Sequence, residues 1–310
     1  MSTVATPAPA PRRRRRRGTK LQRRQTRIVW ILLLPSLAVV AFVAIYPLGK
    51  TVYQSFTNQE FLAGLEPTKW VGLENYRELW HDTIFRDSVW LTIKFTLITV
   101  SFEFALGLII ALVVNSSFKG RGVMRAVMLV PWAIPTVVAA QMWKWMLDDV
   151  FGVVNDLLIK LHIISHPHAW ISDPATSLAS VCAVDIWKTT PFVALLLLAG
   201  LQVIPQDLYE AADVDGASQL QQFWRITLPL LRPAILVTLI FRTLDALRVF
   251  DVFNVFFGNR QDTQTMAIYA QSTIVGDGHV GYGAAVSVAI FLIISLFVVI
   301  YVVFMRVTEE

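Results

Sequence analysis

Apolar residues gather in long, nearly uncharged runs along the chain, with polar residues between them. A helix needs about 20 mostly apolar residues to cross the hydrocarbon core of a bilayer. Six runs reach this length, and they cover approximately residues 28–48, 91–114, 126–146, 178–201, 233–257 and 282–305. The loops on the side opposite the N-terminal tail are too short to form a separate globular domain. The pattern therefore predicts an all-α integral membrane protein whose six transmembrane helices form one domain, residues 28–310.

Composition and charge agree with the bilayer as the main solvent of this chain. Hydrophobic residues make up 55% of the 310 residues and charged residues 16%, which is more apolar than a soluble chain of this length. The formal net charge is +5, but ten of the 27 basic residues precede Ile28, and the rest of the chain holds 17 basic and 22 acidic residues. Nucleic-acid binding needs a basic face, so no nucleic-acid partner is expected.

The N-terminal tail, residues 1–27, is rich in Pro, Ala and Arg and has no acidic residue. This composition cannot bury a core and predicts disorder, and the arginine run at 12–17 predicts attraction to anionic lipid headgroups. Outside the predicted spans, 16 Lys and Arg lie on the side of the tail and six on the other side. The positive-inside rule therefore predicts cytoplasmic N and C termini. The tail dominates this count, which is six against six without it.

Signals for disulfide, metal and nucleotide chemistry are weak. Cys182 is the single cysteine, so neither an intrachain disulfide nor a Cys-based metal site is expected. Three histidines between residues 162 and 168 lack zinc-type spacing and are better explained as solvated. Gly49-Lys50-Thr51 is a fragment of a phosphate-binding loop, but Ala44 stands where that loop needs glycine. We therefore expect no metal and no cofactor in this chain, and no catalysis; ATP must be hydrolysed elsewhere.

A polar segment at residues 206–229 separates the fourth and fifth runs. It begins Gln206-Asp-Leu-Tyr-Glu-Ala-Ala-Asp-Val-Asp-Gly-Ala-Ser and ends Trp-Arg-Ile-Thr-Leu-Pro229. Residues 208–214 predict a short helix, Gly216 permits a tight turn at positive φ, and a second amphipathic helix runs towards Pro229. Such a helix-turn-helix would lie flat on the cytoplasmic surface. Periodicity alone is equally compatible with an ordinary amphipathic connector.

The residues of this segment resemble the EAA loop of ABC-importer permeases. The resemblance rests on Glu210-Ala-Ala212, on Asp215-Gly216 and on Ile226, Leu228 and Pro229. It extends over nearly the whole chain after the tail, through Val71-Gly-Leu-Glu-Asn-Tyr76, Val130-Pro-Trp-Ala-Ile-Pro135 and Asp185-Ile-Trp-Lys-Thr-Thr-Pro-Phe192. The chain is similar to the carbohydrate branch, and in particular to the MalF-type subunit of maltose and trehalose importers.

This resemblance implies the type I ABC importer permease fold, with a cytoplasmic coupling helix between helices 4 and 5. In that family the coupling helix seats in a groove of a cytosolic ATPase, which assigns coupling to Glu210, Ala211, Ala212, Asp215 and Gly216. The implied partners are a second, MalG-like permease subunit, two MalK-like ATPase subunits that bind ATP and Mg, an extracytoplasmic sugar-binding protein and a disaccharide. The implied location is the bacterial cytoplasmic (inner) membrane.

Charged residues at a spacing of three interrupt two of the apolar runs, the fourth and the fifth. Arg242, Asp245, Arg248 and Asp251 are each three residues apart and alternate in sign, and Asp185 and Lys188 repeat this spacing in the fourth run. Each charge would cost about 2.5–3.5 kcal/mol at a lipid-facing midplane position, so these side chains must face protein or water. They either neutralise one another and lock the helix against its neighbours, or they line the substrate path. Both roles can hold for different members.

Aromatic residues beside prolines complete the candidate substrate site. Trp132 lies between Pro131 and Pro135, and Phe192 follows Pro191, which should free backbone carbonyls and break the fourth helix. A sugar offers hydroxyls for hydrogen bonding and an apolar face for an aromatic ring, so Trp132 and Phe192 suit a disaccharide. A place in the aromatic belt at the membrane interface is the alternative for Trp132.

Resemblance to the MalF-type subunit carries its sugar contacts onto eight residues of this chain. They are Trp132, Thr136, Asp185, Lys188, Thr189, Phe192, Asp245 and Arg248. Where the maltose subunit uses neutral amides, this chain has Asp185, Asp245 and Arg248, which argues against maltose itself. The stretches 187–192 and 241–246 look closer to trehalose-importer permeases.

Three other functions stay open from the residues alone. A proton-coupled secondary transporter could relay protons through Asp185 and Asp245 without an ATPase. An ABC permease could carry another solute, such as glycerol phosphate. A scaffold protein could use the amphipathic loop to recruit a cytosolic partner without transport.

Overall fold

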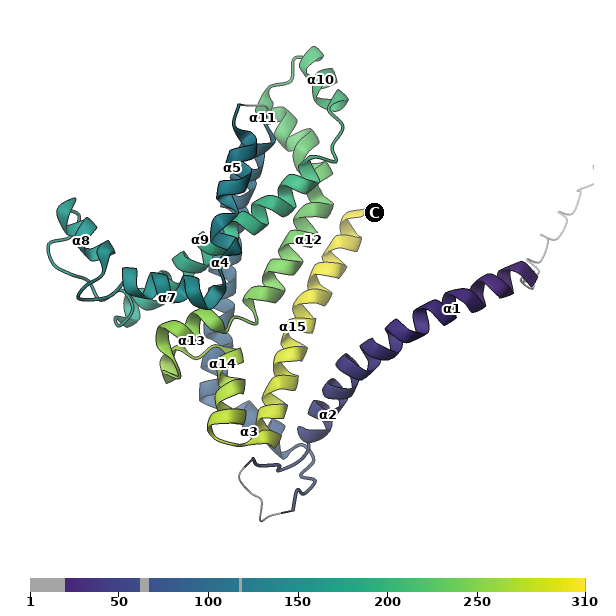
Figure 1. Ribbon diagram of the computed structural model, residues 1–310, viewed down its shortest axis with the longest axis vertical. Coiled ribbons are helices and arrows are strands. Elements are labelled where there is room, and N and C mark those ends of the chain that lie inside the picture. Colours follow the sequence, from purple (N-terminus) through teal and green to yellow (C-terminus); the bar gives the residue numbers. More distant parts are fainter. Residues whose placement is uncertain (1–19, 62–66, 117–118, 310) are drawn as a thin grey trace, which may run out of the picture. The chain divides into compact units, whose positions relative to one another are not determined.

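A computed structural model describes residues 20–61, 67–116 and 119–309 (Figure 1). The chain divides into two compact units, Met1–Thr51 and Val52–Glu310. The described residues form helices and turns but no β-strand, which confirms the predicted all-α fold.

The first unit contains the predicted first span. Helix α1 (Lys20–Val40), the π-helical turn η1 (Ala41–Ile45) and helix α2 (Tyr46–Gln54) follow one another without a break. Residues Thr26–Gln54 are long and apolar enough to cross a membrane. The predicted disorder of residues 1–19 lies outside the described residues, whereas the rest of the predicted tail, from Lys20, is helical.

The second unit is a bundle built around long helices. Its first part contains α3 (Glu74–His81), α4 (Thr83–Asn115), α5 (Arg121–Met128), α6 (Val130–Ala133), α7 (Thr136–Met146), α8 (Val153–Lys160) and α9 (Pro174–Leu201). The coupling segment and fifth span contain α10 (Asp207–Val214), α11 (Gln219–Gln222), η2 (Phe223–Thr227) and α12 (Leu228–Ala246). The remainder contains α13 (Asp251–Phe257), η3 (Gln261–Thr263), α14 (Met266–Gln271), η4 (Ser272–Gly276) and α15 (Val280–Glu309).

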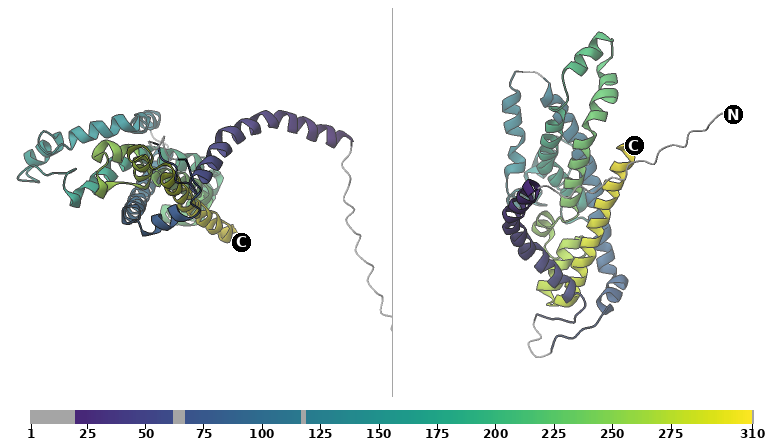
Figure 2. Two further views of the ribbon diagram at one scale, coloured as in Figure 1. Left: turned by 90° about the horizontal axis from the view of Figure 1, so that it is seen from below. Right: turned by 90° about the vertical axis from the view of Figure 1, so that its right-hand side faces the viewer.

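Helices α4, α9 and α12 contact one another, and α15 contacts α12 (Figures 1 and 2). Helix association in lipid depends on close van der Waals packing at small residues. Gly107 of α4 supplies such a contact, because a Cβ added there would lie 2.6 Å from Cγ1 of Val193 on α9. The bundle core includes the fully buried side chains of Phe95, Val181 and Phe253.

The helices that could cross a membrane agree with the six predicted spans, except that the third span is bent. Five helices in the described residues are long and apolar enough to span, and the count is six if the bent pair Arg121–Ala133 and Thr136–Met146 is one span. This third span was predicted as a continuous helix and instead bends by 87°. Ile134 has an extended backbone with ψ 131° because Pro135 excludes the helical conformation from the residue before it.

Two further expectations about helix continuity are wrong. The fifth span was predicted as one helix to residue 257, but α12 ends at Ala246 and α13 starts at Asp251 after a break in which Phe250 has φ −134° and ψ −62°. Pro191 was expected to break the fourth span, but α9 continues through it as an α-helix. Neighbouring helices can accommodate a proline within a transmembrane helix.

Asp82 joins three helices at the end of the bundle opposite the coupling segment. Its carboxylate caps α4 by accepting hydrogen bonds from the backbone N–H groups of Ile84 and Phe85 at 2.8 and 3.1 Å. It also accepts hydrogen bonds from the hydroxyls of Tyr269 on α14 and Tyr282 on α15. Burial acts to raise the pKa of Asp82, but these four hydrogen bonds outweigh it and lower the pKa. Burial and the bond to Asp82 raise the pKa of Tyr269 to about 12.

Candidate substrate cavity and coupling segment

A cavity of about 460 Å³ opens within the bundle. Its walls come from α4, α6, α7, α9, α12 and α13 and from the break between α12 and α13. All eight residues to which the sequence assigned sugar contact line this cavity: Trp132, Thr136, Asp185, Lys188, Thr189, Phe192, Asp245 and Arg248. The structure therefore brings the predicted set together, and binding by these residues stays a prediction.

Two helix breaks create this cavity. The bend before Pro135 brings Trp132 at the end of α6 and Thr136 at the start of α7 to its wall. The break after Ala246 brings Arg248 and Asp251 to the same wall. Irregular backbone at membrane depth is tolerated where it is buried in protein or lines a water-filled cavity, and both breaks lie at such a cavity.

Trp132 and Phe192 pack against each other on one side of the cavity. Their ring centroids lie 5.5 Å apart and their planes are within 11° of parallel. Each ring therefore covers one face of the other, which leaves only the remaining face or edge of each for a ligand. The pair bridges α6 and α9 and forms an aromatic wall against which the apolar face of a sugar ring could lie.

Arg242 of α12 holds three carboxylates from three helices. Its Nη2 donates to Glu103 Oε1 on α4 at 2.8 Å and to Asp185 Oδ2 on α9 at 2.6 Å, and its Nη1 donates to Asp245 Oδ2 at 2.7 Å. Its Nε donates to the second oxygen of Glu103. The side chains of Glu103 and Arg242 are 0% and 3% exposed, whereas that of Asp245 is 71% exposed. The cluster thus reaches from the core to the cavity wall.

This cluster replaces the expected ladder along the fifth span. Only the pair Arg242–Asp245 of that ladder forms an ion pair, because α12 ends at Ala246 and the next charges leave its helical register. Asp185 also pairs with Arg242 of another helix and not with Lys188, its neighbour at the i+3 position. In the described residues no carboxylate lies within 4.0 Å of Lys188 or Arg248. The Nε of Arg248 donates to the carbonyl of Leu244 at 3.3 Å.

Glu103 was not predicted as a member of the charge cluster around Arg242. It is the only acidic residue in the predicted second span, 91–114. An acidic residue inside a membrane span marks a functional position by default, so the signal was present, although its partner 139 residues away was not predictable. The cavity also has aromatic lining residues that were not predicted: Phe95, Phe241 and Phe250.

The coupling segment has the predicted local structure. Helix α10 covers residues Asp207–Val214, and Gly216 has φ 74°, as the predicted tight turn requires. Ser218 then starts α11 with a capping box, in which its side chain accepts from the N–H of Gln221 and the Gln221 side chain accepts from the N–H of Ser218. Helix α11 continues through η2 into α12, so the coupling segment is joined directly to the helix that carries Arg242.

Helix α10 lies at one end of the bundle (Figure 1), and the predicted coupling residues belong to it and to the turn that follows it. Glu210, Ala211, Asp215 and Gly216 are exposed, and Ala212 is half-buried. Nearby apolar side chains are also exposed, including Val214, whose exposed fraction is 89%. The Tyr209 hydroxyl hydrogen-bonds the Thr227 hydroxyl at 2.9 Å, which ties α10 back to η2. An exposed surface that mixes small, apolar and acidic residues is suited to contact with another protein.

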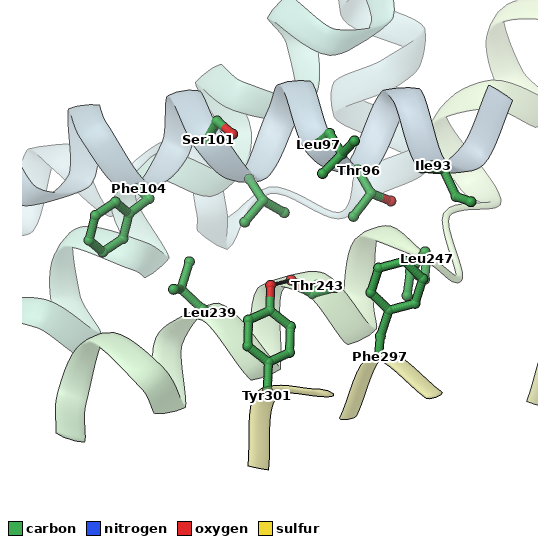
Figure 3. A pocket seen from close by; sticks show the side chains of 11 residues that line it. Ile93, Thr96, Leu97, Ser101, Phe104, Leu239, Thr243, Leu247, Phe297 and Tyr301 are labelled. Carbon is green, nitrogen blue, oxygen red and sulfur yellow. Dashed lines mark hydrogen bonds between the residues drawn. The ribbon is translucent and has the colours of Figure 1, made fainter. Parts of the chain in front are cut away.

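A smaller cavity of about 300 Å³ lies among α4, α12 and α15 (Figure 3). Its lining is mainly apolar, and none of the eight predicted binding residues is part of it. A hydrogen bond of 3.0 Å between the hydroxyls of Thr243 and Tyr301 crosses it. This cavity lacks the convergent polar and charged groups of the larger one and is not a candidate for sugar recognition.

Comparison with known proteins agrees with this geometry. Residues 103–309 match the family described as binding-protein-dependent transport system inner membrane component. The chain is 40% identical over 290 residues to the trehalose/maltose transport system permease protein MalF of Thermococcus litoralis, covering 91% of this chain and 95% of that protein. It is 40% identical over 273 residues to the sulfoquinovosyl glycerol transport system permease protein SmoG of Agrobacterium fabrum, covering 87% and 88%.

A solved structure shares the fold. A chain of a bacterial ABC transporter involved in the import of the acidic polysaccharide alginate aligns with a TM-score of 0.80 at 22% identity, covering 94% of this chain and 100% of that one.

Proposed function

Because the chain belongs to the family of binding-protein-dependent transport system inner membrane components, we propose that it is the permease subunit of an ATP-driven importer of a disaccharide such as trehalose or maltose. The observation that carries this proposal is the cavity in which eight predicted sugar-contact residues meet between two helix breaks. The trehalose/maltose permease among its relatives supports the disaccharide.

The complex would contain four kinds of subunit. This chain and a second, MalG-like permease form the pathway, one of two MalK-like ATPases binds α10 at the cytoplasmic side, and an extracytoplasmic binding protein delivers the sugar. In this arrangement the chain crosses the inner membrane, and both of its termini lie in the cytoplasm. The chain itself performs no bond chemistry, since ATP is hydrolysed by its partners.

Transport would proceed by alternating access. Closure of the ATPases moves α10, and the continuous path from α11 through η2 to α12 carries that movement to Arg242. Since Arg242 joins α4, α9 and α12 beside the cavity, these helices move as a unit and the cavity changes the side on which it opens. The sugar is released because the two states differ in their contacts with it.

Uptake of labelled disaccharide by cells that express the complete importer tests this function. Uptake is expected to persist when an uncoupler removes the proton gradient at constant cellular ATP. Collapse under these conditions would overturn the proposal in favour of the proton-coupled cycle. We do not propose that cycle, because Asp185 and Asp245 both pair with Arg242 and neither is left as a simple proton relay.

An anionic sugar derivative is the second candidate substrate. Lys188 and Arg248 line the cavity with no carboxylate within 4.0 Å in the described residues, and both could pair with an acidic group of a ligand. The relative that carries sulfoquinovosyl glycerol supports this candidate. Competition of labelled disaccharide uptake by trehalose, maltose and glycerol phosphate distinguishes the two, because only the preferred class competes at low concentration.

A further inference from the structure

A separate cavity of about 640 Å³ lies beside the coupling segment. It sits where α4 ends at Asn115, α5 begins at Arg121 and α9 ends at Leu201, and Tyr209 of α10 reaches its wall. Two long apolar helices end there, which places the cavity at the membrane–water boundary. None of the residues assigned to sugar contact lines it.

The lining of this cavity is polar and basic. It contains the side chains of Asn115, Ser116, Gln202, Gln206 and Tyr209 together with two arginines, Arg121 and Arg125, and no acidic residue. Arg121 has no ion pair or side-chain hydrogen bond to the described residues. The positive charge of the cavity is therefore not neutralised within the described part of the chain.

Arg125 has a structural role that accounts for only part of its side chain. Its Nη2 donates to the carbonyl of Val114 at 3.2 Å, which caps the end of α4. Its Nε is inaccessible to solvent and has no hydrogen-bond partner. A buried N–H of a charged group without an acceptor is costly, so the hydrogen bond to Val114 does not fully satisfy the Arg125 guanidinium within the described residues. Helix α5 begins at Arg121 after Gly120 and has no side-chain cap, which adds unpaired N–H groups nearby.

We propose that this cavity binds a phosphate-type oxyanion, held by Arg121 and Arg125 and oriented by the neighbouring amides and by Tyr209. Arginine matches phosphate with paired N–H donors. The oxyanion can be the headgroup of an anionic lipid, which the position at the membrane boundary suits, or a soluble phosphate. The cytoplasmic location of the cavity rests on the proposed function, whereas binding of the oxyanion does not.

An oxyanion in this cavity would connect the start of α5 to the coupling helix. Tyr209 lines the cavity and hydrogen-bonds Thr227, so it joins α10 to η2. A ligand that contacts both the arginines and Tyr209 restrains α10 relative to the bundle. The geometry assigns to the oxyanion a regulatory role, in which it sets how freely the coupling helix moves.

The full chain in lipid nanodiscs tests this site. Thermal unfolding is compared in phosphatidylcholine alone, in phosphatidylcholine with phosphatidylglycerol, and in phosphatidylcholine with inorganic phosphate against chloride at equal ionic strength. We expect a higher midpoint with phosphatidylglycerol if the source is lipid and with inorganic phosphate if the source is soluble. The R121Q/R125Q variant should bind the effective anion about thirtyfold more weakly, roughly fivefold for each basic residue removed near a membrane surface.

Arg232→Gln is the control, because it removes one positive charge, half of what R121Q/R125Q removes, from an exposed side chain that does not line the cavity. If R121Q/R125Q does not fold, Gln206→Glu replaces it, since this change adds a negative charge to the cavity at nearly constant volume. Loss of binding in either cavity variant with retention in the control supports the site. Equal binding by all variants, or no effect of either anion on the unmodified chain, overturns it. Neither result depends on sugar transport.

Discussion

Removal of Arg242 should destabilise the bundle far more than removal of another arginine from the same region. The Arg242→Gln change leaves three carboxylates without their shared cation, and the Glu103 side chain among them is 0% exposed. Breaking a buried ion pair by removing one partner costs about 3–5 kcal/mol, because the remaining charge stays buried without compensation. Two of the three carboxylates are largely withdrawn from solvent, so we expect a loss in the upper part of this range.

Unfolding in detergent micelles by increasing SDS, followed by circular dichroism, measures this loss. The matched control is Arg248→Gln, which removes the same charge from an exposed side chain and should change the free energy of unfolding by less than about 0.5 kcal/mol. A second variant separates charge from packing: with Glu103→Gln and Asp185→Asn added to Arg242→Gln, much of the stability should return. Equal stability of Arg242→Gln and Arg248→Gln would refute the reasoning.

The remaining predictions concern coupling, binding, packing and pH. Glu210→Lys should abolish sugar-stimulated ATPase activity in the reconstituted complex while the complex still assembles in part; stimulation at the normal level would exclude Glu210 from coupling. Asp245→Ala and Arg248→Ala should reduce sugar uptake at limiting concentration more than they reduce ATPase binding, and unchanged uptake in both would remove them from the path. Gly107→Leu should lower the unfolding midpoint, because a Cβ there meets Val193 at 2.6 Å; Gly122→Leu is the control at a position with open space. The lowered pKa of Asp82 stabilises the fold above its unfolded pKa, about 3.9, and this contribution is lost as pH falls through the folded value. The unmodified chain should therefore have a higher free energy of unfolding than Asp82→Asn at pH 7, and this difference should shrink as the pH is lowered. A difference that does not change with pH would contradict the role of the Asp82 carboxylate.

Elements that depend on residues close together in the sequence were predicted correctly from local patterns. Apolar runs of sufficient length located the membrane helices, since the bilayer thickness alone sets that length. The coupling segment was also predictable, because Gly216 and Ser218 act within their own turns. The eight cavity residues were identified by resemblance, and the structure brings them to one cavity.

Long-range pairing was not predictable from the sequence. The i, i+3 spacing of charges suggested pairs within one helix, but Arg242 pairs with Glu103 and Asp185, which lie 139 and 57 residues away. That outcome depends on how α4, α9 and α12 pack, which no local pattern records. The bend at Pro135 had a visible cause, yet hydropathy averages over such a break and predicts one straight span.

The ATPase activity of the purified complex in lipid, with its binding protein present, tests the central proposal most directly. We predict that one disaccharide among trehalose, maltose and sucrose stimulates ATP hydrolysis and that the Glu210→Lys complex does not respond. Stimulation by glycerol phosphate alone would indicate that the transported substrate is anionic and binds at Lys188 and Arg248. No stimulation by any of these solutes, with the ATPases and the binding protein assembled on this chain, would contradict its role in sugar import.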